Sequence, residues 1–87
     1  LHATGLNHRR IAERAPYDLI VANILAGPLT ALAPAVGRVA AHGATIILSG
    51  LLTSQAARVL SAYRGQSMVL TRRIVRKDWE TLVLEKR

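Results

Sequence analysis

The 87-residue sequence has no cysteine and no phenylalanine, and aromatic residues make up only 3% of it. Without cysteine there are no disulfides and no thiolate metal sites, so the core depends on packing alone. The chain is shorter than the ~100–200 residues typical of a domain, which excludes a second independent domain and predicts marginal stability. Long apolar runs are also missing, because Asn23, Gly27 and Pro28 interrupt the longest one well before the ~18–20 residues that span a bilayer.

Acidic residues are scarce: five Asp and Glu stand against 12 Lys and Arg, for a net charge of +7. The basic excess lies in residues 1–14 and 64–87. It is compatible with nucleic acid, an acidic protein partner or a solvated surface, and we favour the last. Residues 1–14 carry charge without an apolar run, so no secretory signal is indicated. Because the sequence starts at Leu1, we expect a fragment or processed product. Without a signal or spanning segment in these residues, a cytoplasmic location is our default expectation.

Hydrophobic residues form 51% of the chain, and their spacing predicts alternating elements. Residues 1–16 are predicted to be an irregular lead-in. The continuous apolar run in residues 17–24 is typical of a parallel strand buried on both faces. Apolar spacings of three and four predict a helix over residues 28–41. We expect Pro34 to kink this helix or delay its regular start, and Gly43 to take a left-handed conformation at its end.

A second buried strand is predicted over residues 45–50. It is followed by a second helix over residues 53–64, capped by Thr53 and ended by Gly65. The order strand, helix, strand, helix over residues 17–65 indicates right-handed crossovers and a parallel sheet.

Residues 68–86 break this alternation. They hold two strand-like runs, 68–76 and 79–86, and only Lys77 and Asp78 lie between them. Such a short connection predicts an antiparallel hairpin, although the imperfect alternation does not fix its register. The predicted fold class is α/β.

Two places at strand ends are candidates for chemistry, because ligands bind beyond the carboxyl ends of strands in an open α/β sheet. One is Asn23, a polar residue at the end of an apolar strand, and the other is Ser49–Gly50. Asn23 either positions a ligand or satisfies loop backbone. Since Ser49 has no identifiable base partner, we expect it at a strand end or a cofactor rim and not as a nucleophile.

The remaining polar groups are weaker candidates. The histidines are scattered without ligand spacing, so we expect loop residues and no metal site; they are His2, His8 and His42. The basic run over residues 72–77 either contacts RNA phosphates or prevents aggregation at a sheet edge, and we favour the second interpretation.

The segment Asn-Ile-Leu-Ala-Gly-Pro-Leu at residues 23–29, preceded by Tyr-Asp-Leu-Ile-Val-Ala, resembles the fourth-strand motif of S-adenosylmethionine-dependent methyltransferases. Within these, it is similar to the ribosomal-protein L-eleven methyltransferase family. The resemblance covers residues 17–84 and continues through Leu32-Ala33-Pro34, His42-Gly43 (usually Pro-Gly-Gly in the family), Leu48-Ser49-Gly50-Leu51, Gln55-Ala56 and Trp79.

This resemblance implies the carboxyl-terminal half of a doubly wound, Rossmann-like sheet, with the last strand inserted antiparallel between the two strands before it. It implies S-adenosylmethionine as cofactor and a ribosomal protein as substrate, methylated on amino groups of lysine side chains or at an α-amine. The family's glycine-rich cofactor loop and the acidic residue that ends its second strand are absent from these 87 residues. The chain alone is therefore expected to be inactive.

By the family pattern, Asn23 lies at the cofactor and at the substrate amine. Methyl transfer to an amine needs a neutral, oriented nucleophile, which amide and backbone oxygens can provide by positioning. The candidate catalytic groups are the Asn23 side chain and the carbonyls of Ile24 and Leu25. The common Asn-Pro-Pro-aromatic version is absent here, which points away from a DNA-base or glutamine enzyme.

Two alternatives stay open. One is a small basic RNA-binding module, weakened by the near absence of aromatic residues for base stacking. The other is an inactive methyltransferase remnant used for interaction. For the isolated chain we expect no membrane contact, weak binding of nucleic acid, and self-association through the open edge of strand 17–24 or a bare sheet face.

Overall fold

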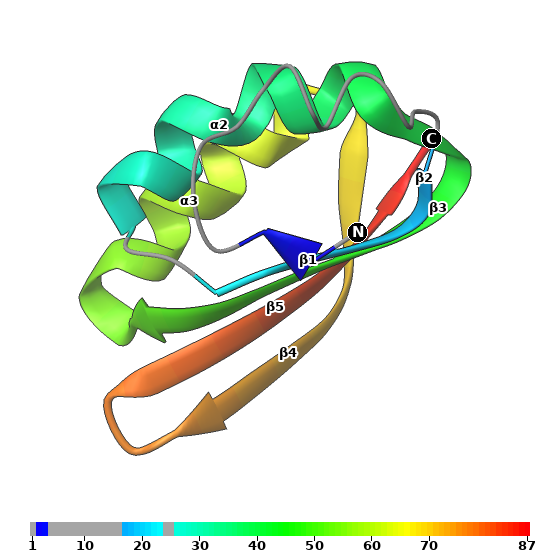
Figure 1. Cartoon of the computed structure of the whole chain (residues 1–87). Helices are drawn as coiled ribbons and strands as arrows, with labels where there is room; N and C mark the ends of the chain where they lie inside the picture. Colours follow the sequence, from blue (N-terminus) through cyan, green and yellow to red (C-terminus); the bar gives the residue numbers. More distant parts are fainter. Residues whose placement is uncertain (1, 4–16, 24–25) are drawn as a thin grey trace.

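The computed structural model describes residues 2–3, 17–23 and 26–87. Within these ranges, two helices lie over one face of a five-stranded sheet (Figure 1). The elements are, in chain order, β1 (His2–Ala3), β2 (Tyr17–Ala22), α2 (Ala26–Val39), β3 (Ala40–Leu52), α3 (Thr53–Arg64), β4 (Met68–Arg76) and β5 (Trp79–Lys86).

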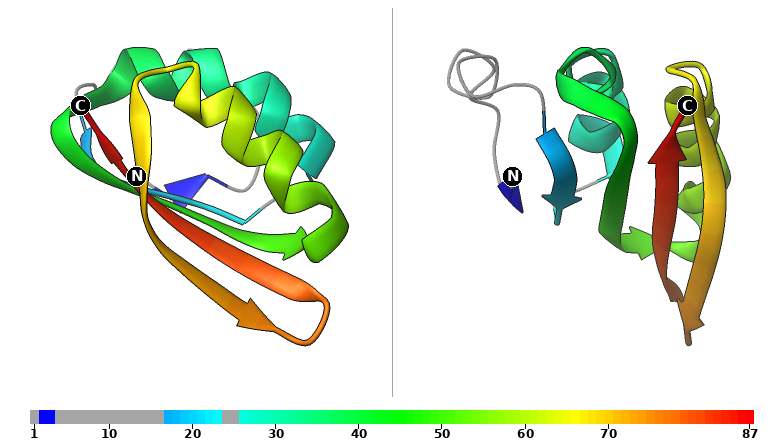
Figure 2. Two further views of the ribbon diagram at one scale, coloured as in Figure 1. Left: turned by 180° about the vertical axis from the view of Figure 1, so that it is seen from behind. Right: turned by 90° about the vertical axis from the view of Figure 1, so that its right-hand side faces the viewer.

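The strand order in the sheet is β1-β2-β3-β5-β4. β1, β2 and β3 are parallel, whereas β5 is antiparallel to both of its neighbours. Figure 2 shows β5 between β3 and β4, although β5 follows β4 in the sequence. This is the insertion that the resemblance implies. The expected α/β fold, with two parallel strand–helix units followed by an antiparallel hairpin, is confirmed.

The hairpin strands begin and end where the sequence predicts. Arg76 pairs with Trp79 across the Lys77–Asp78 turn, and Lys77 takes a φ of +54°. The register shifts once, between Leu70 and Arg72, which places an extra residue on β4.

The predicted irregular lead-in over residues 1–16 is wrong at its start. His2–Ala3 form β1 and pair in parallel with Val21 and Ala22. Backbone pairing needs only free N–H and C=O groups, so two residues leave no side-chain pattern to detect. The edge of β2 that was expected to be open is therefore paired at its carboxyl-terminal end, through Val21 and Ala22. Residues 4–16 lie outside the described residues.

The predicted bounds of the first helix and second strand also need correction. α2 spans Ala26–Val39 and continues through Pro34, which neither delays its start nor ends it. Buried residues on both sides of Pro34 hold the helix by packing, which outweighs local propensity. The second strand was predicted over residues 45–50, but β3 spans Ala40–Leu52. Gly43 has the expected positive φ, +82°, but it lies inside this strand and not at the end of α2.

α3 has the predicted bounds, but Thr53 is its first residue and not its cap. Leu52, at the end of β3, stands in the cap position and donates its backbone N–H to the Gln55 side chain at 3.3 Å. The Thr53 N–H donates instead to the backbone carbonyl of Asp78 at 2.8 Å. The start of α3 is therefore tied to the hairpin turn.

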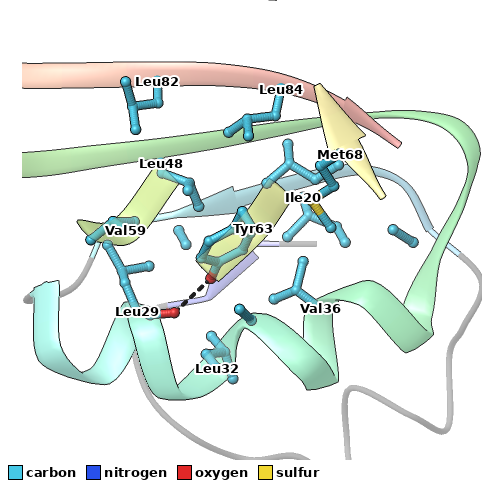
Figure 3. Packing of buried hydrophobic residues seen from close by; sticks show 14 of the residues in the cluster. Ile20, Leu29, Leu32, Val36, Leu48, Val59, Tyr63, Met68, Leu82 and Leu84 are labelled. Carbon is cyan, nitrogen blue, oxygen red and sulfur yellow. Dashed lines mark hydrogen bonds between the residues drawn. The ribbon is translucent and has the colours of Figure 1, made fainter. Parts of the chain in front are cut away.

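The core lies between the helices and one face of the sheet (Figure 3). Tyr63 of α3 is completely buried, and its hydroxyl donates to the backbone carbonyl of Leu29 in α2 at 2.9 Å. Burial raises the pKa of Tyr63. Around this contact pack fully buried side chains from both helices and three strands: Ile20, Leu29, Leu32, Ile46, Leu48, Val59 and Leu84.

The opposite sheet face has no helix on it among the described residues (Figure 1). Val21, Ile47 and Val83 lie opposite one another across three strands of this face and are only partly buried. Leu19 on the same face is 48% exposed. We call these four residues the uncovered face. The expectation that strand 17–24 is buried on both faces is therefore wrong in this chain, because both helices pack on the same side.

We expect the isolated 87-residue chain to form dimers or larger species at micromolar concentration, since partly exposed apolar faces recruit other chains. Ile47→Lys places a charge at the centre of the uncovered face and will shift the chain towards monomer in sedimentation velocity. Val75→Lys is the matched control, because Val75 is an exposed apolar residue outside this face. A monodisperse wild-type monomer would show that the face does not mediate association.

Tyr63 should make stability fall at alkaline pH. In the unfolded chain tyrosine ionises near pH 10, and in the folded chain the pKa of Tyr63 is higher. Above pH 10 the unfolded state therefore holds fewer protons, and the free energy of unfolding drops by up to ~1.4 kcal/mol per pH unit. Below pH 10 Tyr63 is protonated in both states, so the free energy of unfolding does not change with pH through this group.

Tyr63→Phe removes both the hydrogen bond and the ionisable group. We expect the variant to lose about 1 kcal/mol at pH 7 and to show a shallower alkaline fall. Urea unfolding at pH 7 and between pH 9 and 11 measures both effects. Equal alkaline slopes in the two proteins would contradict the assignment to Tyr63.

Candidate functional site at the ends of β2 and β3

β2 and β3 are parallel neighbours, so their carboxyl ends lie at the same edge of the sheet. Ala22 pairs with Leu48, and the next residues along each strand are Asn23 and Ser49. Asn23 is exposed, and Ser49 is partly buried. The structure thus places Asn23, at the end of β2, beside Ser49–Gly50 of β3. The prediction that Ser49–Gly50 closes the second strand is wrong, because β3 continues to Leu52.

Gly50 lies directly against the Asn23 side chain. Its φ is +78°, and a β carbon built on it would lie 2.7 Å from Asn23 Oδ1. An ordinary van der Waals contact is 3.4–4 Å, so only glycine leaves room for the amide in this position. The sequence analysis selected Gly50 as a strand end but missed this contact. The available signal was a glycine inside a strand pattern, which often marks a bulge or a close approach.

Two of the three candidate catalytic residues, Ile24 and Leu25, lie outside the described residues, and their roles stay predictions. Asn23, Ser49 and Gly50 carry no charge. An asparagine side chain offers one acceptor oxygen and two N–H donors. These three residues can therefore orient a ligand by hydrogen bonding, but none of the three has a side chain that transfers protons near neutral pH.

The basic run of the hairpin divides into two kinds of residue. Arg73 binds Glu80 with two hydrogen bonds, from Nε to Oε2 at 2.9 Å and from a terminal nitrogen to Oε1 at 2.7 Å. Glu80 is 2% exposed. Its hydrogen bond and its charge raise the pKa of Arg73. Arg72, Arg76 and Lys77 are exposed to solvent.

No metal site is found in the described part of the chain, where no three His, Asp or Glu side chains gather closely enough to bind an ion. His42 is exposed in β3. The side chains of His2 and His8 lie outside the described residues. Neither helix of residues 26–87 is long and apolar enough to cross a membrane.

Comparison with known proteins gives a consistent result. A family model described as ribosomal protein L11 methyltransferase (PrmA) matches residues 2–87. The ribosomal protein L11 methyltransferase of Caulobacter sp. (strain K31) is 45% identical over 86 residues, covering 99% of this chain and 30% of the relative. That of Agrobacterium fabrum is 48% identical over 84 residues, covering 97% of this chain and 29% of the relative. The chain thus spans about three tenths of the length of these relatives.

Solved structures show the same likeness. A ribosomal protein L11 methylase from Lactobacillus delbrueckii subsp. bulgaricus superposes with a TM-score of 0.78 at 28% identity, over 85% of this chain and 39% of the other. A 16S rRNA N2 G1207 methyltransferase from T. thermophilus, solved with AdoMet and guanosine, has a TM-score of 0.61 at 22% identity, over 85% of this chain and 21% of the other. The second likeness shows the fold alone.

Arg73 and Arg72 should differ in their effect on stability, although they are adjacent and both exposed. Arg73→Ala leaves the buried Glu80 carboxylate without its partner, which destabilises a fold more than losing a solvated charge does. We expect a lower urea midpoint for Arg73→Ala and an unchanged one for Arg72→Ala, at equal loss of net charge. Equal midpoints for the two variants would mean that the pair does not stabilise the hairpin.

Proposed function

Because the chain belongs to the ribosomal protein L11 methyltransferase family, we propose that it is the carboxyl-terminal part of an S-adenosylmethionine-dependent protein N-methyltransferase. The proposed acceptors are amino groups of a ribosomal protein, on lysine side chains or at an α-amine. We propose that the full-length enzyme acts in the cytoplasm and that these 87 residues alone are inactive. The observation that carries the proposal is the exposed Asn23 amide at the end of β2, held against Gly50 of β3.

The proposed role of Asn23 is to orient the acceptor amine. When bound, S-adenosylmethionine supplies an electrophilic methyl group. A neutral amine has one lone pair, and its N–H groups need acceptors that turn this lone pair towards the methyl carbon. The Asn23 oxygen is one such acceptor, and we assign the same role to the backbone carbonyls of Ile24 and Leu25. Catalysis of this kind depends on position, because a correctly held nucleophile reacts as if highly concentrated.

The substrate amine reaches the site as an ammonium ion and must lose a proton before it attacks the methyl group. Asn23 and Ser49 are uncharged, so they do not stabilise the ammonium form as a nearby carboxylate would. We therefore assign this proton to solvent and propose no acidic base.

The residues at this edge fit one rim of a cofactor site. Asn23 is exposed, Ser49 is partly buried, and the space left by the missing side chain of Gly50 is taken by the Asn23 amide. We propose that Asn23, with Ser49 at the rim, contacts S-adenosylmethionine. The sequence has no glycine-rich loop of the kind that holds this cofactor in the family. We assign the main cofactor contacts to the full-length enzyme outside these 87 residues.

The RNA-binding alternative is less well supported. Arg73 is engaged by Glu80, which leaves Arg72, Arg76 and Lys77 as the exposed cations of the hairpin. With 3% aromatic residues the chain offers few rings for base stacking, so contact with RNA would be limited to phosphates and strongly salt-dependent. The inactive-remnant alternative differs from our proposal only in the activity of the full-length protein.

Asn23→Ala in the full-length enzyme tests the proposal. We expect the methyl-transfer rate to fall on the order of 10²-fold, because one positioning contact is lost, while the urea midpoint stays unchanged. His42→Ala is the control, since His42 is an exposed polar residue near the start of β3, at the opposite end of this strand from Ser49 and Gly50. It should alter neither quantity. Normal methyl transfer by a folded Asn23→Ala enzyme would remove Asn23 from the site.

A further inference from the structure

We propose that Gly50 is a positioning residue for Asn23. By having no β carbon, it leaves in β3 the space that the amide oxygen of Asn23 fills, and so sets the direction in which this amide presents its hydrogen-bonding groups. The inference rests on the catalytic role proposed for Asn23 and adds the residue that determines its orientation.

The distances indicate which part of the Asn23 side chain uses this space. A β carbon on Gly50 would lie 2.7 Å from Oδ1 but 3.9 Å from Cγ. The tip of the amide therefore occupies the volume of the missing atom, while the carbon behind it is at ordinary contact distance. Any other residue at position 50 would push the tip aside. Because Asn23 is exposed, its side chain has solvent into which it can turn.

The local backbone provides a second, independent observation. Leu48 pairs with Leu82, and Leu51 pairs with Glu80, so three steps along β3 correspond to two along β5. The extra residue falls at Ser49–Gly50, where Gly50 has a φ of +78°. A bulge with a left-handed glycine bends its strand and redirects neighbouring groups, and bulges are common beside active sites. Here the bulge occurs where β3 passes the end of β2.

Gly43 separates the effect of the backbone from the effect of the contact. It lies in the same strand with a φ of +82°, yet a β carbon on it would meet nothing within 4 Å. An alanine at either position carries similar backbone strain, because left-handed conformations disfavour residues with a β carbon. Only the alanine at position 50 also displaces Asn23.

The experiment uses four variants of the full-length enzyme: Gly50→Ala, Gly43→Ala, Asn23→Ala and the double variant Asn23→Ala/Gly50→Ala. The measurements are the urea midpoint and kcat, separated from KM for the acceptor. We expect both glycine variants to lower the midpoint by similar amounts, because a flexible amide relieves the overlap by turning away. We expect kcat to fall at least about 10-fold for Gly50→Ala only, through the loss of orientation.

The double variant tests whether Gly50 acts through Asn23. If it does, the double variant will have the kcat of Asn23→Ala alone, because no amide is left to displace. A kcat loss equal to the product of the two single losses would overturn the inference, and so would equal kcat values for Gly50→Ala and Gly43→Ala. Normal kcat for Asn23→Ala is a separate result that refutes the proposed function itself.

Folding of the variants also gives a decisive result. If Gly50→Ala fails to fold while Gly43→Ala folds, the double variant tells whether the overlap with Asn23 or a separate need for glycine at position 50 is the cause. Asn23→Ala should then restore folding in the double variant, which would support the contact. A double variant that also stays unfolded would overturn the inference, because position 50 would then require glycine for a reason unrelated to Asn23.

Discussion

The parallel pairing of β2 with β3 is the constraint on which the rest of the structure depends. The register that sets Ala22 beside Leu48 directs both of these side chains into the core. The same register carries Asn23 past the end of one strand to meet Gly50 of the next. A shift of one residue would turn the apolar side chains of β2 out of the core. Stability and site geometry are therefore fixed by the same set of backbone hydrogen bonds.

Features that depend on local spacing were predictable from the sequence. The strands of the hairpin and the helix Thr53–Arg64 were predicted with the bounds that the structure shows. A two-residue connection leaves little choice but a hairpin, and regular apolar spacing defines a helix. The position of β5 inside the sheet came from the family resemblance, since spacing alone does not say which strands become neighbours. Asn23 was likewise selected because it ends an apolar run.

Features that depend on contacts between distant residues were not predictable. The cap of α3 was assigned to Thr53, but Leu52 at the end of β3 takes the cap position, and the backbone N–H of Thr53 donates to Asp78 of the hairpin turn. The Asn23–Gly50 contact requires both the strand register and the bulge in β3, and neither is visible in a list of residue types. The strand β1 is too short to produce a pattern. In each case a partner brought close by tertiary structure decides the outcome.

The insertion of β5 between β3 and β4 has a consequence for the order in which the sheet forms during translation. β3 and β4 emerge from the ribosome before the strand that joins them. Until residues 79–86 are available, the edges of β3 and β4 that face each other have unpaired backbone groups. Bringing these two strands together costs loop-closure entropy that no backbone hydrogen bond between them offsets. The β3–β5–β4 part of the sheet therefore forms only after residues 79–86 emerge, and nascent chains that pause before Trp79 expose two edges to other chains.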